Sequence, residues 1–386
     1  MMSQASRPQA PSALLIKGGT LWSDGIGFVQ SGNVLIRDGK IEAVGSRVAA
    51  PDNARIVDAT RGYILPGFVE AHSQIGLRGD SIAWDTDEDV RPITPEMRAI
   101  DAYYPFGRDV EDARAAGVTT ALVVPAGKNV LGGTGAIVKL AGSTLDDVIV
   151  KDPAALKLSL GEEAKRDNAA PRTRMGEVAL LRENLEKARD YATKRRRDGA
   201  DPDPKLEPIA ALLRGDFPAI VQAYRAGDIA NALRLAAEFK FKLIIAYGYE
   251  GPLVAADLQR AGVAVVATPI KGLWYRLEKE TFDSGYPAAL LKAGVRVAIQ
   301  QGEGNPFGGR ELLLNAGYLM KYGVSEEDAL RAITSWPAQI LGIDARIGRL
   351  APGADADVLV LSGRPFDIRT RVLDVFINGR EVAVNR

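Results

Sequence analysis

The stretch Tyr63-Ile-Leu-Pro-Gly-Phe-Val-Glu-Ala-His-Ser-Gln-Ile-Gly-Leu77 combines a turn, a short apolar run and a polar end. Its Pro-Gly pair favours a turn, and the apolar residues that follow are typical of a buried strand. Because side chains alternate along a strand, His72 and Gln74 are expected to point the same way from its C-terminal end. Two imidazoles at these positions would hold a metal ion, but the second position here is a glutamine.

This stretch resembles PGFxxAHxH, the motif that opens the barrel of the amidohydrolase superfamily, with Gln74 in place of the second histidine. Two other regions support the resemblance, in the family's order. Residues 32–45 are similar to the GxxLIRDGKIEAVG strands that precede the barrel, and the Asp38-Gly39 pair within them favours a tight hairpin. Residues 348–382, which begin with a GxLxPGADADxxVL pattern, are similar to the family's C-terminal strands. Residues 160–176 resemble the LGExxKR…RTRMG pattern of imidazolonepropionase-like and dipeptidase-like members.

The resemblance implies an α/β fold, with a (β/α)8 TIM-type barrel beside a small β-sandwich built from both chain ends. The expected division puts residues 1–63 and 346–386 in the sandwich and residues 64–345 in the barrel. Between the ends, apolar runs alternate with helical patterns, which is typical of βα units. The candidate barrel strands are residues 68–72, 118–124, 136–140, 156–160, 219–224, 243–247, 264–268 and 297–301.

Two regions depart from this simple alternation. The third candidate strand is ambiguous, because Gly132-Gly133-Thr134-Gly135 before it could turn a hairpin. We interpret these glycines as a turn, since they lack the Lys-Ser/Thr of a phosphate-binding loop. Residues 174–213 carry apolar residues at helical spacing with charges between them, and they predict a charged helical excursion over the barrel mouth.

The composition excludes several classes of function. Lys+Arg and Asp+Glu both number 49, so no net charge favours nucleic acid or an anionic membrane, and the run Lys194-Arg195-Arg196-Arg197 is interpreted as a solvated helix end. Cysteine is absent, which excludes disulfides and thiolate chemistry. No run approaches the roughly 18 apolar residues of a membrane span. The N-terminus lacks the apolar core of a secretory signal, so a cytoplasmic location is expected, with a trimmed secretion signal as the alternative.

The resemblance also implies where metal ligands stand in active relatives, which hold zinc. Those relatives place HxH at strand one, histidines at the ends of strands five and six, and an aspartate at strand eight. This chain has one histidine in total. Gln222 and Tyr224 stand at the histidine positions of strand five, and Tyr247 stands at that of strand six. At strand eight Gly302 replaces the aspartate, although a one-residue slip would put Gln301 or Glu303 there.

Neutral amides and phenols bind zinc poorly, so we expect neither a bound metal nor another cofactor. His72 is the only candidate catalytic residue, and a hydrogen-bonded role without catalysis is favoured over a general base. Glu162 and Glu250 are interpreted either as substrate-orienting groups or as salt-bridge partners of Lys157 and Arg225. The residues expected to line the pocket are His72, Gln74, Glu162, Gln222, Tyr224, Tyr247, Glu250, Gln301 and Glu303.

Three functional hypotheses follow. The first is a non-catalytic member that either binds a small polar ligand or serves as a partner subunit, in a homo-oligomer or with a catalytically intact paralogue. The second is an active hydrolase of carbon–nitrogen bonds other than peptides, with a residual site around His72, Glu162 and Glu303. The third is a purely structural role, which is favoured if side chains close the barrel mouth.

Overall fold

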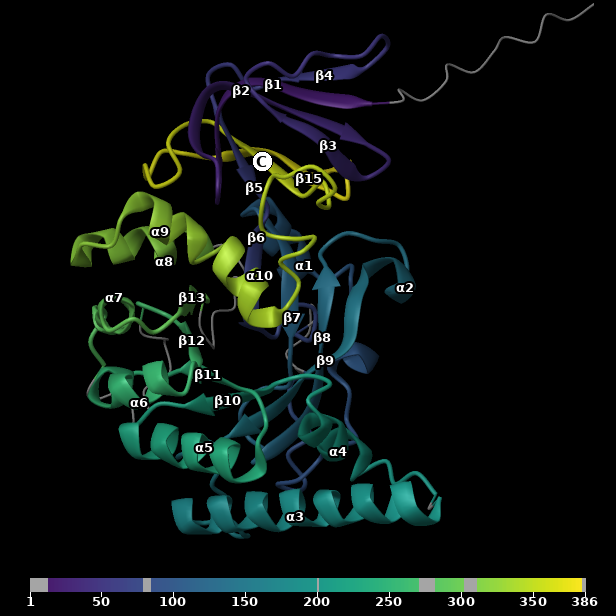
Figure 1. Ribbon diagram of the computed structural model, residues 1–386, viewed down its shortest axis with the longest axis vertical. Helices are drawn as coiled ribbons and strands as arrows, with labels where there is room; N and C mark the ends of the chain where they lie inside the picture. The colour runs from purple at the N-terminus through teal and green to yellow at the C-terminus, as the bar shows by residue number, and fades with distance from the viewer. Residues whose placement is uncertain (1–12, 79–84, 200, 271–281, 302–310, 384–386) are drawn as a thin grey trace, which may run out of the picture.

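A computed structural model describes residues 13–78, 85–199, 201–270, 282–301 and 311–383. Two eight-stranded sheets organise these residues (Figure 1). One sheet contains strands from both ends of the chain, and the other forms a nearly closed barrel. Within the described residues, no helix combines the length and the apolar character that crossing a membrane requires.

The sheet from both chain ends has the order β16-β15-β14-β5-β1-β2-β3, with β4 beside β1. Its central pairing joins β14 to β5 in antiparallel register, which confirms that the two ends of the chain share one sheet. The β2–β3 hairpin turns at Asp38 and Gly39, whose φ angles of 51° and 76° suit the predicted Asp-Gly turn. The strands are β1 (Leu14–Ser23), β2 (Gly27–Arg37), β3 (Lys40–Gly45), β4 (Arg55–Asp58), β5 (Tyr63–Pro66), β14 (Val358–Leu361), β15 (Val372–Ile377) and β16 (Arg380–Val382).

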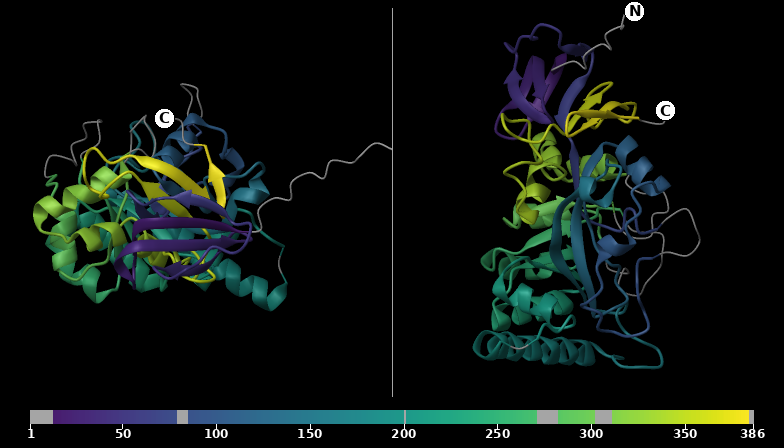
Figure 2. Two further views of the ribbon diagram at one scale, coloured as in Figure 1. Left: turned by 90° about the horizontal axis from the view of Figure 1, so that it is seen from above. Right: turned by 90° about the vertical axis from the view of Figure 1, so that its right-hand side faces the viewer.

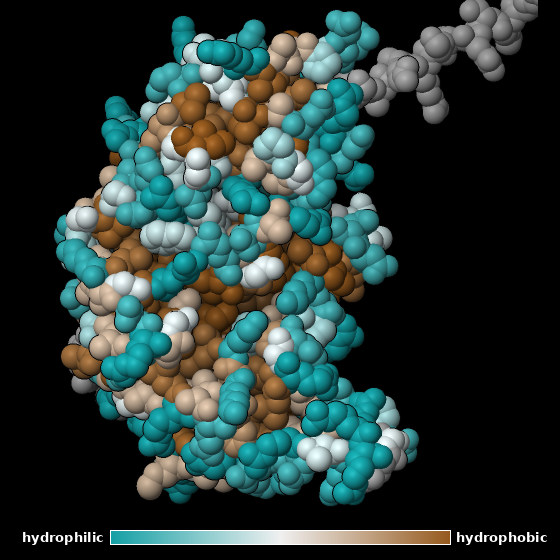
Figure 3. All heavy atoms as spheres, viewed as in Figure 1, coloured by the Kyte–Doolittle hydropathy of each residue, from teal (hydrophilic) through white to brown (hydrophobic). Residues whose placement is uncertain are grey.

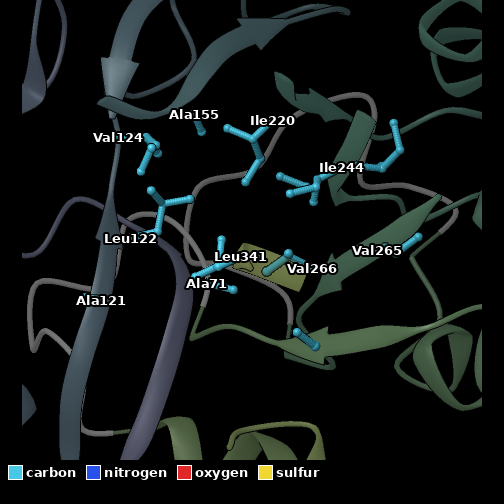
Figure 4. Close-up of a cluster of buried hydrophobic side chains, with 14 of the residues drawn as sticks. Ala71, Ala121, Leu122, Val124, Ala155, Ile220, Ile244, Val265, Val266 and Leu341 are labelled. Carbon is cyan, nitrogen blue, oxygen red and sulfur yellow. The ribbon is translucent and has the colours of Figure 1, made fainter. Parts of the chain in front are cut away.

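The barrel sheet runs from β6 to β13 in chain order, so all eight predicted strands are present with shifted bounds. Its interior is apolar: Figure 4 shows Leu122, Ile220 and Ile244 converging there, with Leu341 of α10 among them. The strands are β6 (Phe68–Ser73), β7 (Val118–Val123), β8 (Leu131–Lys139), β9 (Ile149–Ser159), β10 (Ala219–Ala223), β11 (Leu243–Tyr247), β12 (Ala264–Ala267) and β13 (Val297–Ile299).

The third strand of the barrel departs from a regular (β/α)8 pattern. β8 pairs antiparallel with both β7 and β9, because short connections join these strands where a parallel pair would need a crossover of a dozen or more residues. The glycine cluster interpreted as a turn lies inside β8. There a Cβ on Gly133 would come within 2.4 Å of the Met97 carbonyl oxygen, so glycine lets the two backbones approach closely.

Helices cover the outside of the barrel (Figure 1). The α-helices are α1 (Arg108–Ala115), α2 (Leu145–Val148), α3 (Arg174–Asp198), α4 (Glu207–Arg214), α5 (Ala226–Phe239), α6 (Ala255–Arg260), α7 (Tyr286–Lys292), α8 (Leu312–Tyr318), α9 (Glu326–Arg331) and α10 (Ser335–Leu341). The 3-10 helices are η1 (Ala99–Ala102), η2 (Gly251–Val254) and η4 (Leu319–Tyr322).

The charged excursion consists of α3 and α4. Thr173 caps α3 by accepting from the Gly176 N–H, and Gly199 ends it in the left-handed conformation. α3 packs against α4 and α5 at the end of the molecule away from the sheet of both chain ends (Figures 1 and 2). It therefore runs along the outside of the barrel. The sequence had suggested instead that this excursion covers the barrel mouth.

Buried ion pairs connect the barrel to the segment that leads into β14. Lys139 at the end of β8 bonds to Asp357 and lies 3.2 Å from Asp355, and all three side chains are buried. Burial acts to raise the pKa of Asp355, but Lys139, Lys40 and Arg346 together hold it below its ordinary value. Asp355 and Asp357 of the Gly-Ala-Asp-Ala-Asp segment at residues 353–357 thus connect the barrel sheet to the sheet from both chain ends.

Candidate functional site

Five buried polar side chains meet near the C-terminal ends of the barrel strands, where barrel enzymes carry their chemistry. They come from five different strands or their ends, and each is at most 2% exposed. We call them the polar cluster: His72, Lys157, Gln222, Tyr247 and Gln300. The cluster combines one imidazole, one amino group, two amides and one phenol.

The hydrogen bonds of His72 define its tautomer. The Gln300 amide donates from Nε2 to the Val266 carbonyl at 3.1 Å, so its oxygen faces His72 Nδ1 at 2.8 Å. Nδ1 therefore carries the proton, and Nε2 presents its lone pair to Lys157 Nζ at 3.3 Å. Burial lowers the pKa of His72 well below its ordinary value, and the positive charge of Lys157 lowers it further. His72 is a neutral ring with both nitrogens engaged.

Lys157 continues a chain of hydrogen bonds across the barrel. Its Nζ donates to Gln222 Oε1 at 2.7 Å, and Gln222 Nε2 donates to Glu163 Oε2 at 2.6 Å. Gln222 Nε2 also lies 3.1 Å from the Tyr224 hydroxyl oxygen. The amide of Gln222 thus links the buried lysine to a carboxylate nearer the surface, and both of its polar atoms have partners.

Aromatic rings close the same end of the barrel. Tyr224 and Tyr247 stack with centroids 5.0 Å apart, and Tyr247 meets the His72 ring edge-on at 5.6 Å. The Tyr247 backbone has a φ of 71°, a conformation uncommon for a residue with a side chain. Its carbonyl accepts from the Tyr286 hydroxyl at 2.6 Å. These contacts hold the Tyr247 ring beside His72.

Little open space remains at this end of the barrel. The cavity beside His72 has a volume of about 10 Å³ and is also lined by Gln74, Asp109, Tyr247 and Gln301. That volume suits roughly one water molecule. Within the described part of the chain, Gln74 Nε2 and Gln301 Oε1 are buried without a hydrogen-bond partner. A cavity of this size does not accommodate an organic ligand.

The structure places the residues predicted from sequence in four groups, and the two glutamates form the fourth. His72, Gln222, Tyr224 and Tyr247 come together, and Gln74 and Gln301 line the adjoining cavity. Gln301, one of the two alternatives at strand eight, is thus near His72, whereas Gly302 and Glu303 lie outside the described residues.

The two predicted glutamates contact the first residues of α3 and α5, and Glu162 also contacts Lys165 in the loop before α3. Glu162 accepts from Lys165 and from Arg174 of α3, each at 2.6 Å, and these cations hold the pKa of Glu162 below its ordinary value although burial opposes them. Glu250 accepts from the Ala226 N–H at the start of α5 at 2.9 Å. Both carboxylates thus stabilise the helices around the barrel.

Several residues of the site were not predicted. Lys157, Gln300 and Glu163 take part in the hydrogen bonds around His72, and the fully buried Glu70 accepts from the Gln301 N–H at 3.2 Å. A signal was available for two of them, because Glu70 and Lys157 are charged residues with apolar neighbours on both sides in β6 and β9. A charge in such a strand needs a partner from elsewhere in the fold.

The donor chemistry of the site does not fit a catalytic zinc ion. Zinc binds imidazole, thiolate or carboxylate, and a catalytic site draws three such ligands from the protein. Here the lone pair of the single imidazole points at Lys157 Nζ, and Gln222 and Tyr247 supply only an amide and a phenol. Among the described residues that line the cavity beside His72, Asp109 is the one carboxylate. In the described ranges, no three His, Cys, Asp or Glu side chains are grouped so that they could hold a metal ion.

Glu70 makes the stability of the fold depend on pH. Burial raises its pKa from the ordinary 4.5 to about 8, so the folded protein retains a proton that the unfolded chain has released at neutral pH. The free energy of unfolding should therefore fall as pH rises from about 5 to about 8. Glu70→Gln, which mimics the protonated acid, should flatten this profile in urea titrations. Burial also raises the pKa of Glu177, to about 7, so this residue lowers the free energy of unfolding over the same pH range. Because Glu177 is present in both proteins, the effect of Glu70 is the difference between the pH profiles of wild type and Glu70→Gln.

Residues 286–383 match a family model described as the amidohydrolase family. The crystal structure of an amidohydrolase from Thermotoga maritima has a TM-score of 0.91 and 36% identity, covering 96% of this chain and 99% of that chain. The amidohydrolase tasK of Hapsidospora irregularis is 27% identical over 90% of this chain, which spans 39% of that protein. The imidazolonepropionase of Chromobacterium violaceum is 36% identical over 27% of this chain and 25% of that protein.

Proposed function

This chain belongs to the amidohydrolase family, and on that premise we propose that it is a non-catalytic member that serves as a partner subunit of a catalytically intact relative. The observation that carries the proposal is the contact between Lys157 Nζ and His72 Nε2 at 3.3 Å. A zinc ion bound to that nitrogen would lie about 2.1 Å from it, which leaves no space for the amino group. The positive charge of Lys157 would also repel the ion.

The same arrangement argues against metal-free catalysis by His72. A general base needs a free lone pair within reach of the proton that it removes. The Nε2 lone pair of His72 faces a donor, and burial lowers the pKa of the ring well below its ordinary value. Ser73, the neighbouring hydroxyl, donates to the Leu122 carbonyl at 3.1 Å, so it is not poised as a nucleophile.

The packing favours a subunit over a ligand-binding barrel. Pockets for small organic molecules have volumes of roughly 300–1,000 Å³, whereas the cavity beside His72 measures about 10 Å³. At this end the rings of Tyr224, Tyr247 and His72 pack on one another, and hydrogen bonds join His72, Lys157 and Gln222. A small polar ligand is the second candidate within this proposal, and it would have to displace part of that packing.

The expected result is that the purified protein keeps no stoichiometric metal after zinc loading and desalting, and hydrolyses no N-acyl amino acid, dipeptide or cyclic amide. Elemental analysis and product assays measure this. Gln74→His should not change either result, because it supplies one ligand while Lys157 still faces His72. The matched control for the metal measurement combines Gln74→His, Gln222→His, Tyr247→His and Lys157→Ala, because this variant restores imidazoles and removes the competing charge.

Two outcomes would contradict the proposal and favour the carbon–nitrogen hydrolase. One is a full equivalent of metal on the wild-type protein, and the other is turnover that His72→Ala abolishes. The subunit role is tested separately, by mass photometry of the chain mixed with a catalytically intact relative. A mixture that contains only the two separate species would contradict that role.

A further inference from the structure

A groove lies between α3, α4 and the C-terminal end of α5, far from the polar cluster. Its volume is about 540 Å³. Its walls include the apolar side chains of Ala192, Ala210, Leu213 and Phe239, which come from all three helices. The groove is therefore a recess between packed helices with an apolar floor.

The rim of this groove is strongly basic. Five cationic residues line it, against the single carboxylate of Glu207. That carboxylate bonds to Arg195 and lies 3.2 Å from Arg214, so it is already neutralised within the groove. In the described part of the chain, the other three cations form no salt bridge. The five cationic residues that line the groove are Arg189, Arg195, Arg196, Arg214 and Lys240.

The end of α3 alone does not account for this charge. Arg195 and Arg196 stand in its last turn, where cations favour the negative end of the helix dipole. Arg189 lies earlier in α3, Arg214 ends α4, and Lys240 follows α5, so three elements bring like charges together. The whole chain has equal numbers of acidic and basic residues, so composition does not explain it either. Concentrated like charge destabilises a fold unless an opposite charge meets it.

We propose that the groove is the docking site for an acidic, amphipathic segment of the partner protein. Carboxylates of that segment would pair with the rim arginines, whose planar guanidinium groups suit carboxylate geometry. Its apolar side chains would lie on the floor beside Leu213 and Ala192. The inference rests on the proposed function, because it names where the partner subunit binds and by what chemistry.

Other occupants fit less well. Two-fold docking of a second copy on this groove would place two basic rims face to face. Single-stranded nucleic acid stacks on exposed rings, but Tyr191 and Phe239 are at least nine-tenths buried, and Arg195 and Arg189 lie over their rings at 6.0 and 5.5 Å. A bilayer surface cannot enter a recess between helices.

The test uses the full chain and a fluorescein-labelled peptide that alternates pairs of glutamates with leucine and phenylalanine. Fluorescence anisotropy should show binding that weakens with salt. Replacing Arg189, Arg196 and Lys240 together by glutamine should weaken binding by about tenfold or more. The same variant should melt no lower than wild type, because it relieves repulsion. Ala192→Trp, which fills the floor and keeps every charge, should also weaken binding.

Lys194→Glu is the matched control, since it changes an exposed charge of α3 that does not line the groove. It should leave affinity within about twofold. Equal peptide binding by wild type and the triple variant would overturn the proposal. So would tighter binding of a DNA duplex or of phosphatidylserine vesicles that depends on the same three cations. If the wild-type protein holds no metal and does not bind the peptide, only the docking site is refuted. If it binds the peptide but holds a full equivalent of metal, only the non-catalytic role is refuted.

Discussion

Replacing Lys139 by methionine is expected to lower the free energy of unfolding by about 3–5 kcal/mol. Methionine has a similar length but no charge, so Asp355 and Asp357 would stay buried without the lysine between them. A buried carboxylate that loses its partner costs far more than an exposed one. Urea unfolding at neutral pH, followed by circular dichroism, measures the difference.

Lys40→Met provides the control, because Lys40 pairs with the same Asp355 but has a side chain that is 45% exposed. This variant should lose less than about 1 kcal/mol. The difference in stability between Lys139→Met and wild type should narrow as pH falls toward 4, because the unpaired carboxylates of the variant take up protons. In wild type the pKa of Asp355 is held below 3.8, so this carboxylate stays ionised and paired at pH 4. Equal stability of the two lysine variants would mean that these ion pairs do not fasten the sheets.

Tyr247→Ala is expected to destabilise the protein by about 3–5 kcal/mol, the usual cost of truncating a buried ring. Its ring is 1% exposed and contacts the rings of Tyr224, Tyr249 and His72. If side chains close the barrel end, as the proposed function requires, removing this ring leaves a cavity in a packed region. Guanidinium unfolding measures the loss.

Tyr104→Ala is a suitable comparison, since Tyr104 is 50% exposed and also contacts another ring, that of Phe106. It should change stability by less than about 1 kcal/mol. A similarly small effect at Tyr247 would indicate a loosely packed barrel end that can admit a ligand. That result would favour the ligand-binding candidate over the partner subunit.

Local patterns in the sequence determined much of the architecture. The Pro-Gly turn and the apolar run after it predicted β6, and the Asp38-Gly39 pair predicted the β2–β3 hairpin. These predictions succeed because turns and strand alternation depend on residues a few positions apart. The replacement of family histidines by Gln222, Tyr224 and Tyr247 was also visible, since a residue's identity needs no structure.

Tertiary structure alone decided the direction of β8 and the partners of the buried charges. The sequence left the third strand ambiguous, because the same apolar run suits a parallel or an antiparallel neighbour. It named Glu162 for the site, whereas Glu163 is the residue that bonds to Gln222, and a shift of one position redirects a side chain. The contact of Lys157 with His72 joins residues 85 positions apart. Such a pair forms only when the barrel brings distant strands together, so no local pattern predicts it.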